Sequence, residues 1–125
     1  MSQPRRPSDR RPRRGEVWYV FTPGQPDDPH QPCPAVVVSE NVRNRMRDDL
    51  IVVPVFSGGQ LGPTRVRLPS GAGGLRHQSV VFCEEITTID RDFLASGPAG
   101  VLAPSLVDAV VRGIRRAIGE VVTEP

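Results

Sequence analysis

The pattern of hydrophobic and polar positions predicts a small domain of short strands followed by one helix. β-Branched and aromatic residues gather in segments separated by turns rich in glycine and proline, as is typical of an all-β domain. The continuous apolar run 35–39 predicts a strand buried on both faces. The alternating run 64–68 predicts a half-exposed strand with Arg65 and Arg67 on one face. The five predicted strands are 15–21, 35–39, 50–56, 64–68 and 79–86, with 87–89 as an extension of the last.

The clearest helical pattern lies near the C-terminal end. Pro104 suits a first helical position and Gly119 suits a stop, and apolar residues recur at helical spacing between them. Arg112, Arg115 and Arg116 lie near the C-terminal end of this helix, where they complement its dipole. We therefore interpret the helix as a lid on a small barrel and prefer this role for its arginines to a contact with nucleic acid.

The remaining segments predict loops and turns. Residues 22–34 are rich in proline and form a long loop, and residues 57–63 form a flexible one. Loops as long as 22–34 usually carry function or movement in a compact domain. Residues 90–95 predict one helical turn capped by Asp90.

Length and composition favour one intracellular domain. A chain of 125 residues suits one domain, and no stretch approaches the roughly 20 apolar residues of a membrane span. Cys33 and Cys83 are expected to be free thiols of a cytoplasmic protein. His30 and His77 could add ligands, but no CxxC or HxxxH pair occurs, so we expect neither a metal nor another cofactor.

Charge is distributed unevenly along the chain. All 16 basic residues are arginines, and six of them fall within the first fourteen residues. Residues 15–125 then hold ten arginines against thirteen acidic residues, a net charge of −3. The sequence thus predicts a disordered arginine-rich arm at 1–13, a domain at 14–120 and a short tail at 121–125. The arm either attracts phosphates or serves as a solubilising tail, and composition favours neither interpretation.

Several segments, in the right order, resemble the MazF/PemK growth-inhibitor family, the toxins of toxin–antitoxin pairs. The resemblance covers about residues 14–119. Its segments are RGEVWYV at 14–20, PAVVVS at 34–39 followed by Asn41, Asn44 and Arg45, VVPVFSGG at 52–59, the Gly-Leu to Thr-Ile-Asp block at 74–90, and the terminal helix at 102–119. Each segment is weak alone, and the ordered set is fairly specific.

The resemblance implies a mainly β fold, a small SH3-like barrel of the CcdB/MazF type with a C-terminal helix, as a homodimer. It implies a metal-independent endoribonuclease that cuts single-stranded RNA in a groove, with the cognate antitoxin peptide occupying that groove to inhibit. In such a cleavage the ribose 2′-OH attacks the adjacent phosphate, so a base, an acid and stabilisation of the phosphorane are needed.

The sequence departs from the family pattern where catalysis is expected. Cys33 stands where the family has an arginine, and Phe56 stands where it has a threonine. Three accounts remain open. Ser57 and a nearby basic residue replace the usual pair, or the proline-rich loop is aligned differently, or the protein no longer cuts RNA. Ser57 can replace Phe56 only if the strand ends or bulges there.

These considerations give a set of candidate residues, each with a structural alternative. Ser57, Arg65 and Glu84 are the predicted catalytic residues. The predicted RNA-binding residues are Arg14, Asp28, His30, Asn41, Asn44, Arg45, Arg67, Glu85 and Thr87. The imidazole of His30 suits acid–base work near neutral pH, yet a lone loop histidine is more often a surface residue.

Two further hypotheses are kept beside the endoribonuclease. One is a non-cleaving toxin-fold module that binds RNA or a protein target, as the CcdB toxins do; fold alone cannot decide this. The chain ends in VVTEP, without the exposed Trp on which the CcdB mode depends. The other is a general RNA-binding barrel driven by the arginine-rich arm.

Overall fold

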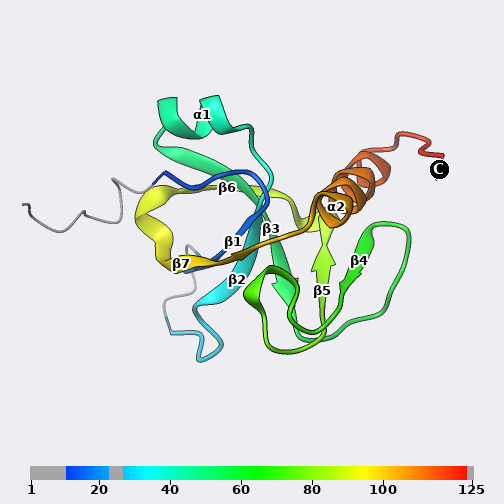
Figure 1. Ribbon diagram of the computed structural model, residues 1–125, viewed down its shortest axis with the longest axis horizontal. Helices are drawn as coiled ribbons and strands as arrows, with labels where there is room; N and C mark the ends of the chain where they lie inside the picture. The colour runs from blue at the N-terminus through cyan, green and yellow to red at the C-terminus, as the bar shows by residue number, and fades with distance from the viewer. Residues whose placement is uncertain (1–10, 23–26, 124–125) are drawn as a thin grey trace, which may run out of the picture.

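The computed structural model describes residues 11–22 and 27–123. Within these residues the chain forms seven β-strands, two α-helices and three single 3₁₀ turns (Figure 1). The strands are β1 (Glu16–Val20), β2 (Cys33–Val37), β3 (Asp49–Phe56), β4 (Arg65–Leu68), β5 (Ser79–Phe82), β6 (Thr87–Asp90) and β7 (Leu94–Val101). The helices are α1 (Asn41–Met46) and α2 (Pro104–Ala117), and the 3₁₀ turns are η2 (Ala72–Gly74), η3 (Cys83–Glu85) and η4 (Arg91–Phe93).

Strand β3 organises the sheet because it pairs along both edges. Its Val52 lies opposite Val37 of β2 on one edge and opposite Thr87 of β6 on the other. Its last residues, Val55 and Phe56, pair with β5 instead. The strand order is β4-β5-β3-β2-β1-β7, and each of these pairings is antiparallel. A long strand shared in this way lets a short chain bend its sheet into a small barrel-like body.

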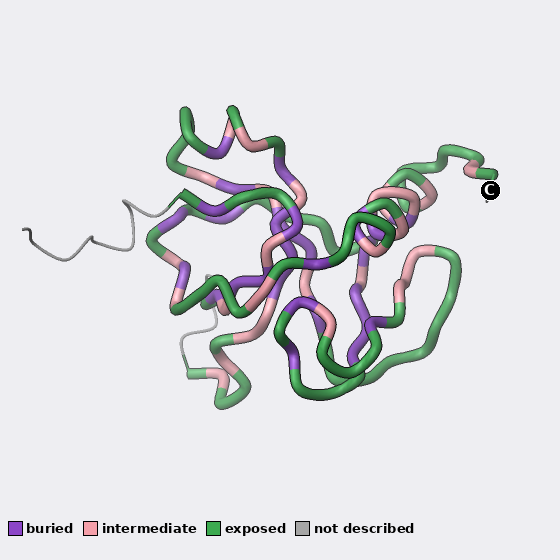
Figure 2. Tube along the Cα trace, in the orientation of Figure 1, coloured by how far each residue is buried: buried purple, intermediate pink, exposed green. Residues whose placement is uncertain are grey.

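Both faces of the central strands are buried, which explains their continuous apolar runs. On β2, Val36 packs into one core while Ala35 and Val37 pack into another. The first core lies under α2, which contributes Val107 and Val110, and the second holds side chains of β6 and β7. Buried positions accordingly follow the central strands and one side of α2, whereas the connecting loops are exposed (Figure 2).

The strands predicted from β-branched runs and the terminal helix are confirmed within one or two residues, except at the end of the predicted strand 79–86. Strand β2 begins at Cys33, so Cys33 and Pro34 belong to the sheet rather than to the loop before it. The predicted strand 79–86 ends at Phe82, because the chain turns through η3 and starts β6 as a separate strand paired with β3. Asp90 caps η4 as predicted, and its carboxylate accepts a hydrogen bond from the backbone N–H of Asp92.

Helix α1 was not predicted, because the segment is polar and only six residues long. Glu40 caps it, accepting hydrogen bonds from the backbone N–H groups of Val42 and Arg43. Asn44 is the buried residue of this helix, and its side-chain amide donates a hydrogen bond to the carbonyl of Ser39 at 3.0 Å. Local capping and one buried amide therefore define an element that carries no hydrophobic period.

Strand β7 was not predicted either, since Ala, Ser, Gly and Pro dominate its middle. Its extended form comes from pairing with β1, with register shifts around Tyr19. Gly97 adopts a φ of +152°, and a Cβ there would lie 2.7 Å from the Trp18 ring. The close approach of β7 to Trp18 therefore requires glycine.

The described body extends slightly before residue 14. Pro12 is fully buried, and the backbone N–H of Arg13 donates to the Glu16 carboxylate at 2.7 Å. These residues pack on the body rather than belonging to the predicted arm, of which 1–10 lie outside the described residues. No helix in the described part of the chain is long and apolar enough to cross a membrane.

Candidate functional site

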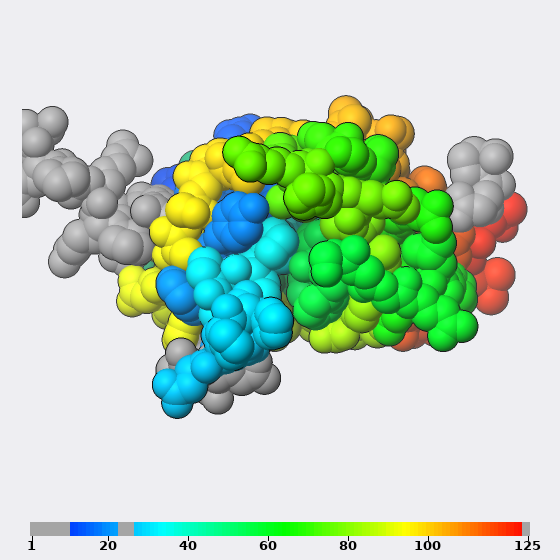
Figure 3. Space-filling model, turned by 90° about the horizontal axis from the view of Figure 1, so that it is seen from below, coloured from blue at the N-terminus to red at the C-terminus, as the bar shows by residue number. Residues whose placement is uncertain are grey.

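A large groove opens beside the ends of β1, β2 and β3. Its volume is about 1580 Å³, and it is bounded by the loop before β2, the start of the loop after β3, the segment between η2 and β5, and β6. In Figure 3 the residues leading into β2, in cyan, lie beside the green residues that follow β3. Because three separate loops meet here, side chains distant in sequence share one concave surface.

Five of the predicted site residues line this groove, and four of them are exposed. They are Ser57, Asp28, His30, Glu85 and Thr87, with Asp28 half-buried. The loop carrying His30 is held locally, since the carboxylate of Asp28 accepts a hydrogen bond from the His30 backbone N–H at 2.9 Å. The groove therefore offers hydroxyl, imidazole and carboxylate groups together, which is the set that acid–base chemistry on a phosphodiester requires.

Cys33 and Phe56 also line the groove, at the two positions where the family pattern is broken. The Cys33 thiol donates a hydrogen bond to the carbonyl oxygen of His30 at 3.0 Å. Burial, helped by the nearby Asp28 carboxylate, raises the pKa of Cys33 above its ordinary value. The thiol therefore stays protonated and supplies none of the positive charge that an arginine would bring.

The predicted catalytic residues Arg65 and Glu84 form an ion pair that does not line the groove. The Arg65 Nη2 and Nε atoms donate to one oxygen of Glu84 at 2.7 and 3.0 Å, and Thr64 donates to the other at 3.0 Å. The hydrogen bond from Arg65 is the main reason that the pKa of Glu84 lies below its ordinary value. A carboxylate held in this way is a poor proton acceptor.

An aromatic pair connects this ion pair to the groove. The Arg65 guanidinium lies 3.7 Å from the centre of the Phe82 ring. Phe82 packs in turn on Phe56, with ring centres 4.5 Å apart, and Phe56 is 36% exposed at the groove wall. The three predicted catalytic residues are therefore not together. Ser57 lines the groove, whereas Arg65 and Glu84 lie outside it, with Arg65 against the Phe82 ring.

The remaining predicted RNA-binding residues do not line the groove. Asn44, predicted to bind RNA, is fully buried and its side chain is hydrogen-bonded to Ser39, so it is not accessible to a ligand in this chain. Asn41 accepts a hydrogen bond from the backbone N–H of Arg14 at 2.7 Å, joining α1 to the start of β1. Arg45 is exposed on α1, and Arg67 is exposed on β4.

The predicted site residues leave out several groove residues between η2 and β5. Arg76, His77 and Gln78 are exposed there, and Ser79 lies beside them with only 6% of its surface exposed. The Ser79 hydroxyl is buried without a hydrogen-bond partner among the described residues. The only sequence signal was that Arg76 and His77 follow a glycine-rich turn. Within the described residues, no cluster of three or more His, Cys, Asp or Glu side chains could hold a metal ion.

Comparisons with known proteins agree on the fold. A family model described as "PemK-like, MazF-like toxin of type II toxin-antitoxin system" matches residues 13–118. A comparison with curated proteins finds no match. Among solved structures, the chain is similar to an endoribonuclease in complex with its cognate antitoxin from a mycobacterial species, with 24% identity and a TM-score of 0.71 over 91% of this chain and 99% of that one.

Two further structures are similar to the same extent. MazF from Deinococcus radiodurans has 23% identity and a TM-score of 0.73, over 89% of this chain and 99% of that one. Mycobacterium tuberculosis toxin MazF-mt6 has 20% identity and a TM-score of 0.72, over 86% of this chain and 99% of that one. At these identities the likeness establishes the fold.

Proposed function

Because the chain belongs to the PemK-like, MazF-like toxins of type II toxin–antitoxin systems, we propose that it is an endoribonuclease that cleaves single-stranded RNA in the groove. The observation that carries the proposal is the chemistry of the groove wall. Ser57, His30 and His77 line one concavity with Arg76, so hydroxyl, imidazole and guanidinium groups all face the same space. These are the groups that a metal-independent cleavage uses.

The proposed reaction uses the RNA's own nucleophile. A base removes the proton of a ribose 2′-OH, the O2′–P bond forms, and the P–O5′ bond breaks while an acid protonates the leaving 5′-oxygen. The products are a 2′,3′-cyclic phosphate and a 5′-hydroxyl. His30 and His77 are the proposed base and acid. Both are exposed imidazoles that line the groove, His30 from the loop before β2 and His77 from the segment between η2 and β5.

Charge stabilisation is assigned to Ser57 and Arg76. The phosphorane gains negative charge on its non-bridging oxygens, and donors aimed at those oxygens lower the barrier. Arg76 lines the groove, whereas Arg65 is engaged by Glu84 and Cys33 carries no charge. In this assignment Arg76 takes over the function that the family gives to an arginine at the position of Cys33, and Ser57 takes over that of the threonine.

The test is incubation of the purified protein with long single-stranded RNAs in EDTA, followed by mapping of the new 5′ ends. Discrete cuts with 5′-hydroxyl ends are expected. Ser57→Ala and Arg76→Gln should each lower the cleavage rate by about 10- to 1000-fold, whereas Arg47→Gln, an exposed arginine just after α1 that does not line the groove, should leave it unchanged. The absence of any discrete cut across many sequence contexts would overturn the proposal.

A non-cleaving binding module is the second candidate. It is favoured by the presence of Cys33 and Phe56 at the positions where the family has an arginine and a threonine. Both residues line the groove and neither can stabilise a phosphorane. This candidate predicts that the protein binds RNA or a protein target through the groove and leaves the RNA intact. Tight binding of a 2′-deoxy-substituted RNA without cleavage of the unsubstituted RNA would select it.

We further propose that the protein acts in the cytoplasm as a homodimer and that a cognate antitoxin peptide occupies the same groove. A solved relative is described in complex with its cognate antitoxin. Occupancy of one groove by two ligands predicts mutual exclusion. Excess antitoxin peptide should therefore displace RNA, and light scattering should report twice the mass of one chain.

A further inference from the structure

Phe56 presents an aromatic ring to the groove beside the residue proposed to bind phosphate. It ends β3, is exposed and lines the groove, and Ser57 follows it directly. A single exposed phenylalanine is ordinary on a protein surface and by itself indicates no ligand. What sets Phe56 apart is its place in a concave wall and the contacts that hold its ring.

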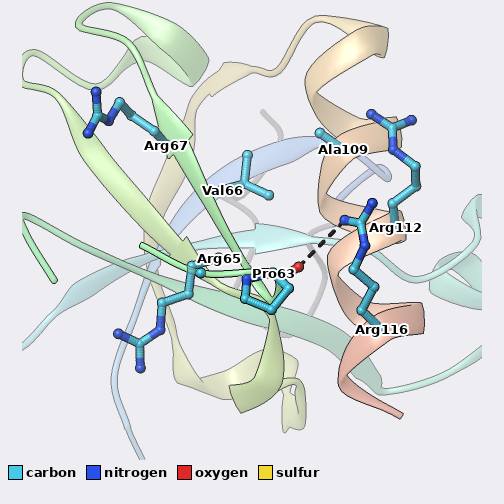
Figure 4. A pocket seen from close by; sticks show the side chains of 8 residues that line it. Pro63, Arg65, Val66, Arg67, Ala109, Arg112 and Arg116 are labelled. Atoms are coloured by element: carbon cyan, nitrogen blue, oxygen red, sulfur yellow. Dashed lines mark hydrogen bonds between the residues drawn. The ribbon is translucent and has the colours of Figure 1, made fainter. Parts of the chain in front are cut away.

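On one side the Phe56 ring is held by a stack of side chains outside the groove. The Phe82 ring lies 4.5 Å from it, centre to centre, with the two ring planes tilted by 57°. The Arg65 guanidinium lies 3.7 Å from the centre of the Phe82 ring, and Glu84 accepts two hydrogen bonds from this guanidinium. Figure 4 shows the Arg65 side chain directed away from α2, in keeping with its contacts to Phe82 and Glu84.

The loop that follows Phe56 is tied to the same stack. A Cβ at Gly59 would lie 2.6 Å from the Phe82 ring, so the backbone of the loop passes directly against that ring. One residue further on, the carbonyl of Gln60 accepts a hydrogen bond from Arg65 at 3.0 Å. The ring and the start of the loop are therefore held in place before a ligand binds, which lowers the entropic cost of binding.

We propose that Phe56 is a stacking surface for a nucleobase of single-stranded RNA, next to the phosphate bound by Ser57. The inference rests on the proposed function and deepens it by assigning the base that the groove holds. A nucleotide carries a flat base and a phosphate on one ribose, and Phe56 and Ser57 offer an aromatic ring and a hydroxyl on consecutive residues. Unpaired bases bind to proteins by stacking on exposed aromatic side chains of this kind.

The surroundings of the ring favour a nucleotide over an apolar peptide side chain. Arg76, His77 and Gln78 line the same groove and are exposed, so the ring is an apolar surface among hydrogen-bonding groups. Every base has a flat face, and in a duplex that face is covered by the neighbouring bases. Phe56 therefore selects unpaired RNA rather than one particular base.

The experiment compares RNA binding by the wild type, Phe56→Leu and Phe56→Tyr. The probes are 2′-O-methyl RNAs of about 12 nucleotides in several sequences, which cannot undergo 2′-OH attack and which carry the fluorescent base 2-aminopurine at each position in turn. Stacking on an aromatic ring quenches this base, so the wild type should quench it strongly at one position. Phe56→Leu should abolish that quenching and raise Kd about 5- to 100-fold, whereas Phe56→Tyr, which keeps the ring, should preserve both.

Two further measurements separate stacking from other roles of Phe56. The slope of log K against log salt should be the same in the wild type and Phe56→Leu, because no phosphate contact is lost. With a cleavable RNA, Phe56→Leu should raise KM and leave kcat nearly unchanged, because a stacked base is bound equally in the ground state and the transition state.

The matched control is Leu61→Ala, which removes an exposed apolar side chain from the same loop but outside the groove. Its quenching and Kd should equal those of the wild type. Because Phe56 also packs on Phe82, melting temperatures are compared for all variants. If Phe56→Leu melts at a lower temperature, Phe56→Met replaces it, since a flexible thioether fills the same space without a ring.

Equal quenching by the wild type and the variant without the ring, or no binding of any probe, would overturn the proposal. So would unchanged RNA affinity together with weaker binding of an antitoxin peptide, which would assign the ring to a protein partner. The proposed function fails separately. If the wild type cuts no RNA, the proposed endoribonuclease is wrong, while the quenching of the uncleavable probes still tests the stacking. If the wild type cuts RNA and Phe56→Leu changes neither quenching nor KM, only the stacking is wrong.

Discussion

Glu84 shows how one side chain can be engaged before any substrate arrives. Its two carboxylate oxygens accept hydrogen bonds from Thr64 and Arg65, and Arg65 is also fixed by the carbonyl of Gln60 and the ring of Phe82. This network joins the loop after β3 to β4 and η3. We therefore assign Glu84 to holding these segments together and leave proton transfer to the imidazoles of the groove.

The first prediction concerns the pH dependence of stability. Because the pKa of Glu84 is lowered in the folded protein, its ionised form stabilises the fold above the unfolded carboxyl's pKa, and this stabilisation is lost as pH falls through the lowered value. The pair is partly solvent-exposed, so Glu84→Gln should cost about 0.5–1 kcal/mol near neutral pH. In acid the difference from the wild type should shrink toward zero.

Urea unfolding at several pH values measures this difference. Glu85→Gln, the neighbouring exposed acid, is the matched control and should show no such trend. A constant difference between wild type and Glu84→Gln at all pH values would contradict the electrostatic account.

At the same scale, sequence reasoning identified some site residues and misplaced others for physical reasons. Ser57 and His30 both line the groove, because the loop after β3 and the loop before β2 lie at neighbouring strand ends. Arg65 and Glu84 were expected at that rim too, but η3 turns Glu84 away from the strand path and into the arginine's reach. Arg76 carried little local signal beyond its position after a glycine-rich turn, because the path of the chain between η2 and β5 is what brings it to the groove.

At the scale of elements, α2 packs on the barrel through a contact that the hydrophobic pattern of the sequence does not predict. Gly113 lies in the middle of the helix and is buried against Cys83 of η3. Glycine in a helix interior costs roughly 1 kcal/mol relative to alanine. Here a Cβ would lie 2.7 Å from the Cys83 Sγ atom, so glycine is required for close docking of the helix.

The second prediction tests that docking. Gly113→Ala should destabilise the protein by about 1–3 kcal/mol despite the better helix propensity of alanine, because the core is overpacked. Cys83→Ala removes the obstructing sulfur, so the double variant should recover part of the loss. A double-mutant cycle from urea unfolding gives the coupling energy. Additive effects of the two substitutions would show that Gly113 and Cys83 do not interact.

Which elements could be predicted depends on what holds each of them. Strands β1, β2 and β3 bury both faces, so their composition alone identifies them, and α2 shows one apolar stripe. Helix α1 depends on the Glu40 cap and the buried amide of Asn44, and β7 depends on its pairing with β1. Elements held by tertiary pairing or by single polar groups leave little periodic signal in the sequence.

At the scale of the whole molecule, charge is separated along the chain in a way that bears on RNA binding. The full chain has a formal net charge of +2. Residues 1–10 contribute three arginines and one aspartate, a net of +2, so residues 11–125 have thirteen basic and thirteen acidic residues and a net of zero. The net charge of residues 11–125 therefore gives no overall attraction for RNA.

The third prediction separates the contribution of the first ten residues from that of the body. Deleting residues 1–10 keeps Pro12 and the Arg13–Glu16 hydrogen bond, so the melting temperature should stay within about 2 °C of the wild type. RNA affinity should fall several-fold at low salt, and the difference should vanish at high salt, because counterion release weakens as salt rises. Replacing Arg5, Arg6 and Arg10 by Gln is the control for chain length and should reproduce the deletion. If affinity is unchanged at low salt, these arginines take no part in binding.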